Sequence, residues 1–272
     1  MGHSYRHFVA LDGDELWERI DQAQARFTAL VKSVGPHLVA EGSTWTARDV
    51  VGHVLTVARR YTERDVMSTE GLGDSPRAVD AINDAELLEL QGLEMDELLA
   101  QLEVQMKTVR AVLPPESTDL HFRFPFHGGV SIDAAGGLSN LIGEFLVHGR
   151  DLARSARRSW NIDARDALLI INGVLQILPG YAEPAATDSL KVCLRVSGAS
   201  DWVLAFDQGK LDSRPATSRE MVDVVLKAPA ETLLLVLYSR IGTAASIRKG
   251  VLLAGGRRPW RIAHLPKHLQ QP

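Results

Sequence analysis

Apolar residues recur at every third or fourth position through the first 160 residues, which is the spacing of amphipathic helices. In residues 14–34, for example, they line one helical face, and a Gly-Pro pair ends the segment. The helices predicted in this way are residues 14–34, 46–67, 96–113 and 134–158. A loop at 71–76 and a short hairpin of residues 122–126 and 130–133 separate them. This pattern predicts a four-helix bundle with one longer connection.

After residue 160 the pattern becomes mixed. Short apolar runs bounded by turn residues predict strands at 190–197, 202–207, 222–227 and 251–254. Helical spacing returns at 167–178 and at 230–239, where Pro229 is tolerated in the first turn. We therefore expect an α+β fold, with a helical bundle over residues 1–160 and a smaller α/β domain over residues 161–272.

Composition and charge narrow the class of protein. Hydrophobic residues make up 45% of the chain and charged residues 24%, as in an ordinary globular protein. The net charge of -4 provides no basic field for nucleic acid. No segment reaches the ~20 apolar residues of a membrane span. Cys193 is the single cysteine, so an internal disulfide is excluded, and we expect a cytoplasmic protein in which Cys193 is a buried small residue.

Polar residues interrupt the apolar faces of two predicted helices. Glu144 and His148 are four positions apart, so they lie on one side of the helix over 134–158. His53 lies among valines in the helix over 46–67. A carboxylate that faces a core is costly unless it is paired or bound to a metal. Three such ligands would leave a coordination position open on a divalent ion. The other interpretation is a surface pair and a structural histidine.

Two stretches around these residues resemble motifs of a known family. Residues 45–53 read WTARDVVGH and residues 143–152 read GEFLVHGRDL. The first resembles the tryptophan-led motif that ends in a metal-binding histidine in the mycothiol-dependent maleylpyruvate isomerase family, and the second resembles that family's motif with a glutamate and the last histidine. The resemblance implies a DinB-like metal-binding bundle in which His53, Glu144 and His148 hold a divalent metal, expected to be Zn²⁺.

The C-terminal half also resembles this family. Residues 222–226, 229–240 and 255–260, the last reading GGRRPW, resemble its smaller sterol-carrier-like domain. The resemblance implies that mycothiol, a small-molecule thiol, binds at the metal, where an open Zn²⁺ position lowers the pKa of a thiol. The implied reaction is isomerisation of a maleylpyruvate-type substrate, in which the thiolate adds to a cis double bond, the bond rotates and the thiolate leaves.

Two other functions remain open at this point. The same thiolate could attack another electrophile and stay attached, which would make the protein a mycothiol S-transferase in detoxification or natural-product biosynthesis. Alternatively, the C-terminal domain could bind an apolar ligand without catalysis. In each case the expected partners are small molecules, with no nucleic acid and no membrane.

Four further residues are candidates for the site. Arg240 ends the helix over 230–239, where the helix dipole favours a cation, and it is the candidate catalytic residue that would bind a substrate carboxylate. Asp151 would either orient a ligand imidazole or pair with Arg154. Arg150 lies beside it. His127, at the hairpin turn, would either line the pocket or have no special role.

Overall fold

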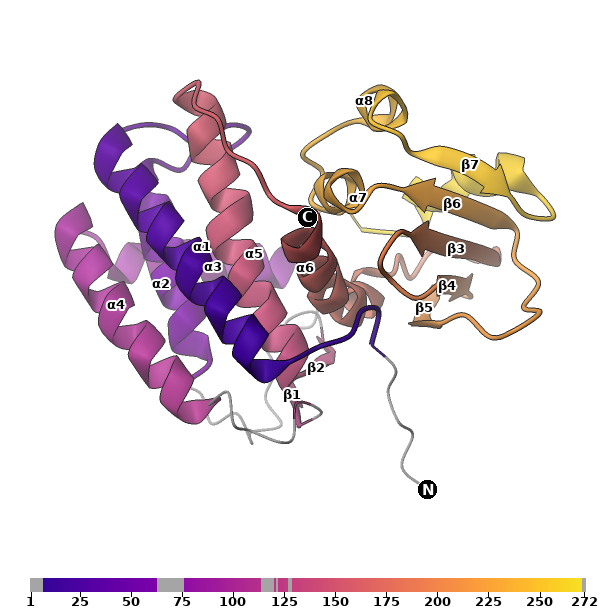
Figure 1. The fold of residues 1–272 in the computed structure, drawn as a ribbon, viewed down its shortest axis with the longest axis horizontal. Helices are drawn as coiled ribbons and strands as arrows, with labels where there is room; N and C mark the ends of the chain where they lie inside the picture. Colours follow the sequence, from indigo (N-terminus) through magenta and orange to yellow (C-terminus); the bar gives the residue numbers. More distant parts are fainter. Residues whose placement is uncertain (1–6, 63–75, 114–119, 121, 127–128, 271–272) are drawn as a thin grey trace.

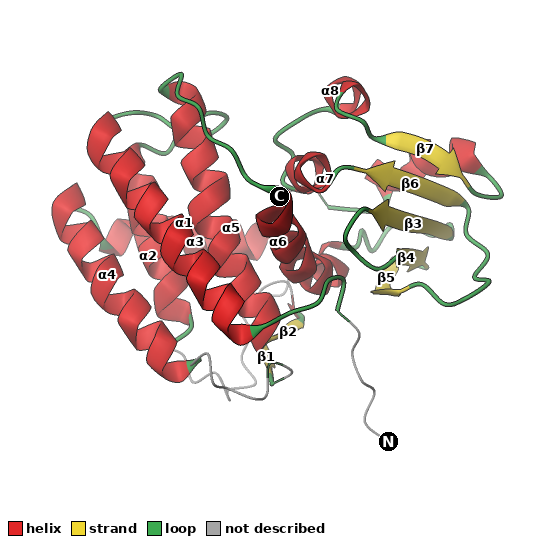
Figure 2. Cartoon of the chain, in the orientation of Figure 1, coloured by secondary structure: helices red, strands yellow, loops and turns green. Residues whose placement is uncertain are grey.

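The computed structural model describes residues 7–62, 76–113, 120, 122–126 and 129–270, and it combines a helical bundle with a five-stranded sheet. In the view of Figure 2 the bundle lies on the left and the sheet on the right. The mixed α and β content agrees with the predicted class. None of the described helices is both long enough and apolar enough to cross a membrane.

The bundle is formed by α1, α2, α4 and α5, and its bounds agree closely with the predicted helices. These helices are Gly13–Val34, Ala47–Arg60, Met95–Val112 and Ala134–Ser155. Helix α1 packs along α5 and α2 packs along α4 (Figure 1). The helix predicted at 46–67 ends at Arg60, and residues 63–67 lie outside the described part of the chain.

Helix α3, Pro76–Glu89, was not predicted, because its apolar and polar residues are not clearly separated onto two faces of the helix. It packs on α2, which supplies the apolar surface that stabilises it. Pro76, the last residue of the expected loop at 71–76, is the first residue of α3, and residues 71–75 lie outside the described part of the chain.

Side-chain caps set the starts of the two helices that matter most for the site. The Thr46 hydroxyl accepts a hydrogen bond from the Asp49 amide, and the Asp49 carboxylate accepts one from the Thr46 amide, which forms a capping box at the start of α2. Asp133 caps α5 by accepting from the Gly136 amide at 2.7 Å. The predicted hairpin directly precedes α5, as strands β1, Arg123–Pro125, and β2, Ser131–Asp133.

Helix α6, Ala164–Ile177, joins the bundle to the sheet. It packs on α5 on one side and on α7, Ala230–Leu237, on the other (Figure 1). A 3₁₀ segment, η2 at Leu178–Tyr181, follows α6. One apolar core runs from the bundle through α6 to the sheet. The division at residue 160 stays a prediction.

The sheet has the strand order β5-β4-β3-β6-β7, with β3 and β6 parallel and the other pairs antiparallel. The strands are β3 Leu190–Val196, β4 Trp202–Asp207, β5 Lys210–Pro215, β6 Val224–Ala228 and β7 Leu252–Gly255. Strand β5 was not predicted, because it lies at the sheet edge and Leu211 is its single buried residue. Two short helical elements, α8 at Thr243–Arg248 and η3 at Pro259–Lys267, were also missed.

Candidate metal centre

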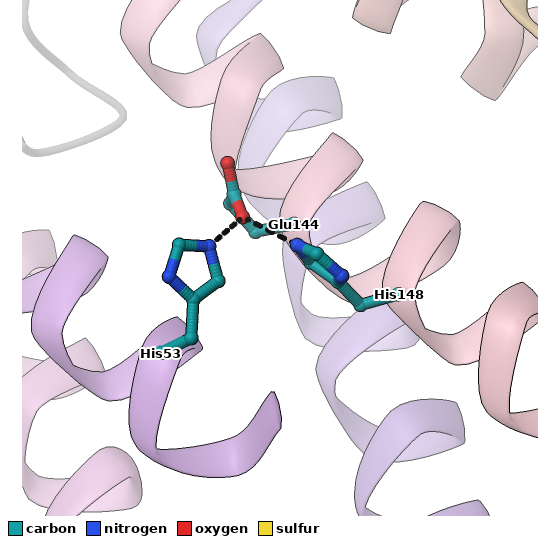
Figure 3. A group of neighbouring side chains, drawn as sticks. All are labelled: His53, Glu144 and His148. Atoms are coloured by element: carbon teal, nitrogen blue, oxygen red, sulfur yellow. Dashed lines mark ion pairs between the residues drawn. The ribbon is translucent and has the colours of Figure 1, made fainter. Parts of the chain in front are cut away.

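Three side chains from two helices converge in the bundle (Figure 3). His53 comes from α2, and Glu144 and His148 come from α5. The Glu144 Oε2 atom lies 3.3 Å from the Nε2 atom of His53 and 3.3 Å from the Nε2 atom of His148. Their potential ligand atoms all lie within 4.8 Å of one another. The side chains of His53, Glu144 and His148 are 8%, 14% and 18% exposed, so each is largely but not completely buried.

The separations from Glu144 Oε2 also agree with those of ligands around a metal ion. A charge-assisted hydrogen bond between nitrogen and a carboxylate is usually about 2.7–2.9 Å long. Two donors on a tetrahedral ion with bonds of about 2.0–2.1 Å lie roughly 3.3 Å apart. The distances from Glu144 Oε2 to the two imidazoles match this second value. Three donors of this kind leave one tetrahedral position open.

The surroundings of Glu144 and His53 favour the protonation states that bind a metal ion. Burial raises the pKa of Glu144, but hydrogen bonds with His148 and His53 outweigh it and hold the pKa well below its ordinary value. Burial lowers the pKa of His53, against the opposing effect of Glu144. Near neutral pH the glutamate is therefore an anion and the His53 imidazole is neutral, which are the states that bind a divalent cation. Asn140 donates to the second oxygen, Glu144 Oε1, at 3.2 Å.

Trp45 closes one side of the centre. Its ring centroid lies 4.8 Å from that of His53 and 6.2 Å from that of His148. The Nδ1 atom of His53 is buried, and no described residue forms a hydrogen bond with it. Ligand imidazoles are commonly oriented by a hydrogen bond at the second nitrogen. Here packing against the indole restrains His53 instead.

Among the solved structures that are similar to this chain, two are of a mycothiol-dependent maleylpyruvate isomerase. One is a histidine-to-alanine variant at 17% sequence identity and the other is described without a substitution, at 16% identity. In both comparisons the TM-score is 0.50, and the match covers 92% of this chain and 95% of the other. This chain shares its fold with that isomerase. No protein-family model matches the chain, and no curated protein has a significantly similar sequence.

A glycine lies next to each predicted ligand, and each allows another element to approach closely. A Cβ on Gly52 would lie 3.1 Å from a leucine of α3. On Gly143 it would lie 2.9 Å from the Tyr238 hydroxyl, and on Gly149 only 2.4 Å from the Trp160 ring. Real Cβ atoms almost never approach other atoms within 3.0 Å. The backbone at the three ligands is therefore held by close packing that a side chain would disturb.

Replacing Gly149 with alanine should lower the free energy of unfolding by about 1–3 kcal/mol, the usual cost of overpacking. The Trp160 ring cannot move freely, because its Nε1 donates to the Leu146 carbonyl at 2.9 Å and Arg26 stacks on it at 4.6 Å. Urea denaturation measures the change. Gly242→Ala is the control, since no atom lies within 4 Å of its Cβ position. Equal stability of the two variants would contradict the prediction.

The structure gives Asp151 and Arg240 partners that were not predicted. The Nε and one terminal nitrogen of Arg240 each lie 2.8 Å from Asp151 Oδ2, and Arg150 lies 3.3 Å from Oδ1. Arg154, the alternative partner considered for Asp151, bonds to Glu41 instead. Since both carboxylate oxygens face arginines, these contacts do not support Asp151 as an acceptor for a ligand imidazole.

Two other sequence candidates lie away from the centre or outside the described residues. His127 belongs to the part of the chain that is not described. Cys193 lies on β3 and is buried, as expected, and burial raises the pKa of its thiol. A buried thiol with a raised pKa is a poor nucleophile.

Sequence reasoning missed three tyrosines near Glu144. Burial, with a contribution from the negative charge of Glu144, raises the pKa of Tyr61 and of Tyr238. Burial, then Asp80 and Glu144, raises the pKa of Tyr181 to about 12. Tyr61 follows the end of α2, Tyr238 follows the end of α7 and Tyr181 is the last residue of η2, so no spacing in the sequence connects them.

Proposed function

We propose that this protein is an enzyme that depends on a divalent metal and on mycothiol, and that it acts as a maleylpyruvate-type cis-trans isomerase. The observation that carries the proposal is the convergence of two imidazoles and one carboxylate, whose potential ligand atoms all lie within 4.8 Å of one another. The shared fold supports it over nearly the whole chain. Two nitrogen donors, one oxygen donor and an open position are typical of catalytic zinc.

The residues of the chain have separate roles in this proposal. His53, Glu144 and His148 would hold the ion, and Trp45 would keep water from one side of it. The bound metal and thiol would supply a thiolate nucleophile that adds to the activated double bond and leaves after rotation. Arg240, whose side chain is 32% exposed, would bind a substrate carboxylate with the N–H groups that remain beside its bonds to Asp151 and to the Tyr238 carbonyl.

One observation favours the alternative, a mycothiol S-transferase. Arg240 already forms an ion pair with Asp151, which reduces the positive charge available to a substrate with two carboxylates. A less charged electrophile would suit such a site better. The metal centre would be the same in both enzymes, because both require an activated thiolate.

The consumption of thiol separates the two reactions. We expect Zn²⁺-loaded protein to convert maleylpyruvate while the mycothiol concentration stays constant, because isomerisation regenerates the thiol. A transferase would consume one mycothiol for each turnover. Both the thiol and the product should be measured in the same sample, with chelator-treated protein as the control. Stoichiometric loss of mycothiol would replace the isomerase by the transferase, and turnover without metal would contradict both.

A further inference from the structure

The end of α7 is built to turn two side chains toward α5. Tyr238 is the last residue before the turn, and Ser239 has a left-handed backbone with φ of 55°. The Ser239 amide donates to the Val236 carbonyl, and the Arg240 amide donates to the Leu235 carbonyl at 2.8 Å. These two bonds form a Schellman motif, in which glycine usually occupies the left-handed position. A serine there indicates a backbone held by its surroundings, as is common at functional sites.

The turn contacts α5 at two points, one before and one after the proposed metal ligands Glu144 and His148. The Tyr238 hydroxyl lies against Gly143, 2.9 Å from the position of a Cβ. Arg240 bonds to Asp151, eight residues further along α5. Glu144 and His148 lie between these two contacts, on the same side of the helix. The end of α7 therefore lies beside the segment of α5 that carries Glu144 and His148.

The Tyr238 hydroxyl is a hydrogen-bond donor with an unused proton. Within the described part of the chain it has no hydrogen-bond partner. Glu144 does not take this proton, since Oε1 accepts from Asn140 and Oε2 faces the two imidazoles. Burial and the nearby carboxylate keep the phenol in its neutral, donating form.

We propose that Tyr238 is a further catalytic residue, whose hydroxyl donates a hydrogen bond to the substrate oxygen that becomes negative during thiol addition. The proposal rests on the proposed function. As the carbon–sulfur bond forms, the π electron pair of the double bond moves through the conjugated carbonyl to its oxygen. The pair returns when the carbon–sulfur bond breaks. Tyr238 keeps its proton throughout and stabilises the oxyanion in both directions.

The Tyr238→Phe variant tests this proposal, because it removes the hydroxyl and keeps the ring. We expect kcat to fall about 100-fold, as for the loss of one oxyanion donor, with KM little changed. Metal content should be unchanged. Titration of the Co²⁺-loaded variant with mycothiol, followed by visible absorption, should give the wild-type dissociation constant, because Tyr238 is assigned to the substrate and not to the thiol.

A second variant tests the position of the hydroxyl. In Gly143→Ala the new Cβ would meet the hydroxyl at 2.9 Å but the ring carbon that bears it at 3.8 Å, which is ordinary contact. Gly143→Ala should therefore lower kcat in the wild-type background, and much less in the Tyr238→Phe background. The new Cβ also lies 3.0 Å from Ile170. This contact is the same in both backgrounds, so its effect on kcat cancels when the two single variants are compared with the double variant.

The outcomes separate this proposal from the proposed function. Wild-type turnover that needs thiol, together with an unchanged kcat in Tyr238→Phe, would overturn the role of Tyr238 alone. Additive effects of the two substitutions, or a changed affinity for mycothiol in the Co²⁺ titration, would also overturn it. Absence of thiol-dependent turnover in the wild-type protein would overturn both proposals.

Discussion

Replacing His148 with alanine should remove most of the metal from the purified protein and abolish thiol-dependent turnover. The change leaves one imidazole and one carboxylate, which hold a divalent ion far more weakly than three donors. The loss of affinity should exceed the roughly 10- to 100-fold that follows from loss of an outer-shell partner. Elemental analysis of metal per chain measures the effect, and wild-type protein should hold about one divalent ion.

The control is another histidine that bonds to a carboxylate. His264 on η3 lies 3.3 Å from Asp188, and its side chain is 44% exposed. Changing His264 to alanine should leave both metal content and turnover unchanged. Metal binding should also raise the free energy of unfolding of the wild-type protein, by about 4 kcal/mol when the free metal concentration is a thousand times the dissociation constant. Equal metal content in the two variants would rule out the assignment of His148 as a ligand.

If the protein is an isomerase, replacing Arg240 with alanine should lower kcat/KM roughly 30-fold, because a charged contact to the substrate is lost. This factor corresponds to about 2 kcal/mol of transition-state stabilisation. A transferase for an uncharged electrophile should lose little. The variant also breaks the ion pair with Asp151, whose side chain is 3% exposed, so some stability will be lost as well. Steady-state kinetics and urea denaturation should therefore be measured together.

Asp151→Asn is the matched variant, since it breaks the same ion pair and keeps the guanidinium. We expect it to lower stability while most of the kcat/KM remains. If both variants lose turnover to the same extent, Arg240 acts only by holding α7 against α5. Binding of a substrate carboxylate by Arg240 would then be excluded.

Local signals in the sequence were sufficient for most of the helices and strands. The capping box of Thr46 and Asp49 marks the start of α2, and the apolar spacing that follows defines its buried face. The short apolar runs of β3 and β4, each bounded by turn residues, likewise indicate strands. Helix α3 and strand β5 were missed because neither has a strong apolar period, and each is stabilised by the neighbour on which it packs.

The sequence by itself determined that Glu144 and His148 share one side of a helix, because four residues span about one helical turn. It also determined that Cys193 lies in an apolar strand. That His53 joins this pair was one of two interpretations of the residues, and the resemblance to a family favoured it, since the angle between α2 and α5 depends on how the whole bundle packs. The geometry of the donors is therefore a property of the tertiary structure.

The contacts between α7 and α5 were decided by the tertiary structure alone. Arg240 and Asp151 are 89 residues apart, and the hydroxyl of Tyr238 reaches α5 only where Gly143 lacks a side chain. Local patterns state which face of an element is apolar, but they do not state which distant element will cover it. That choice depends on the path of the chain through α6 and the sheet, and on the fit of side chains in a core with little free space.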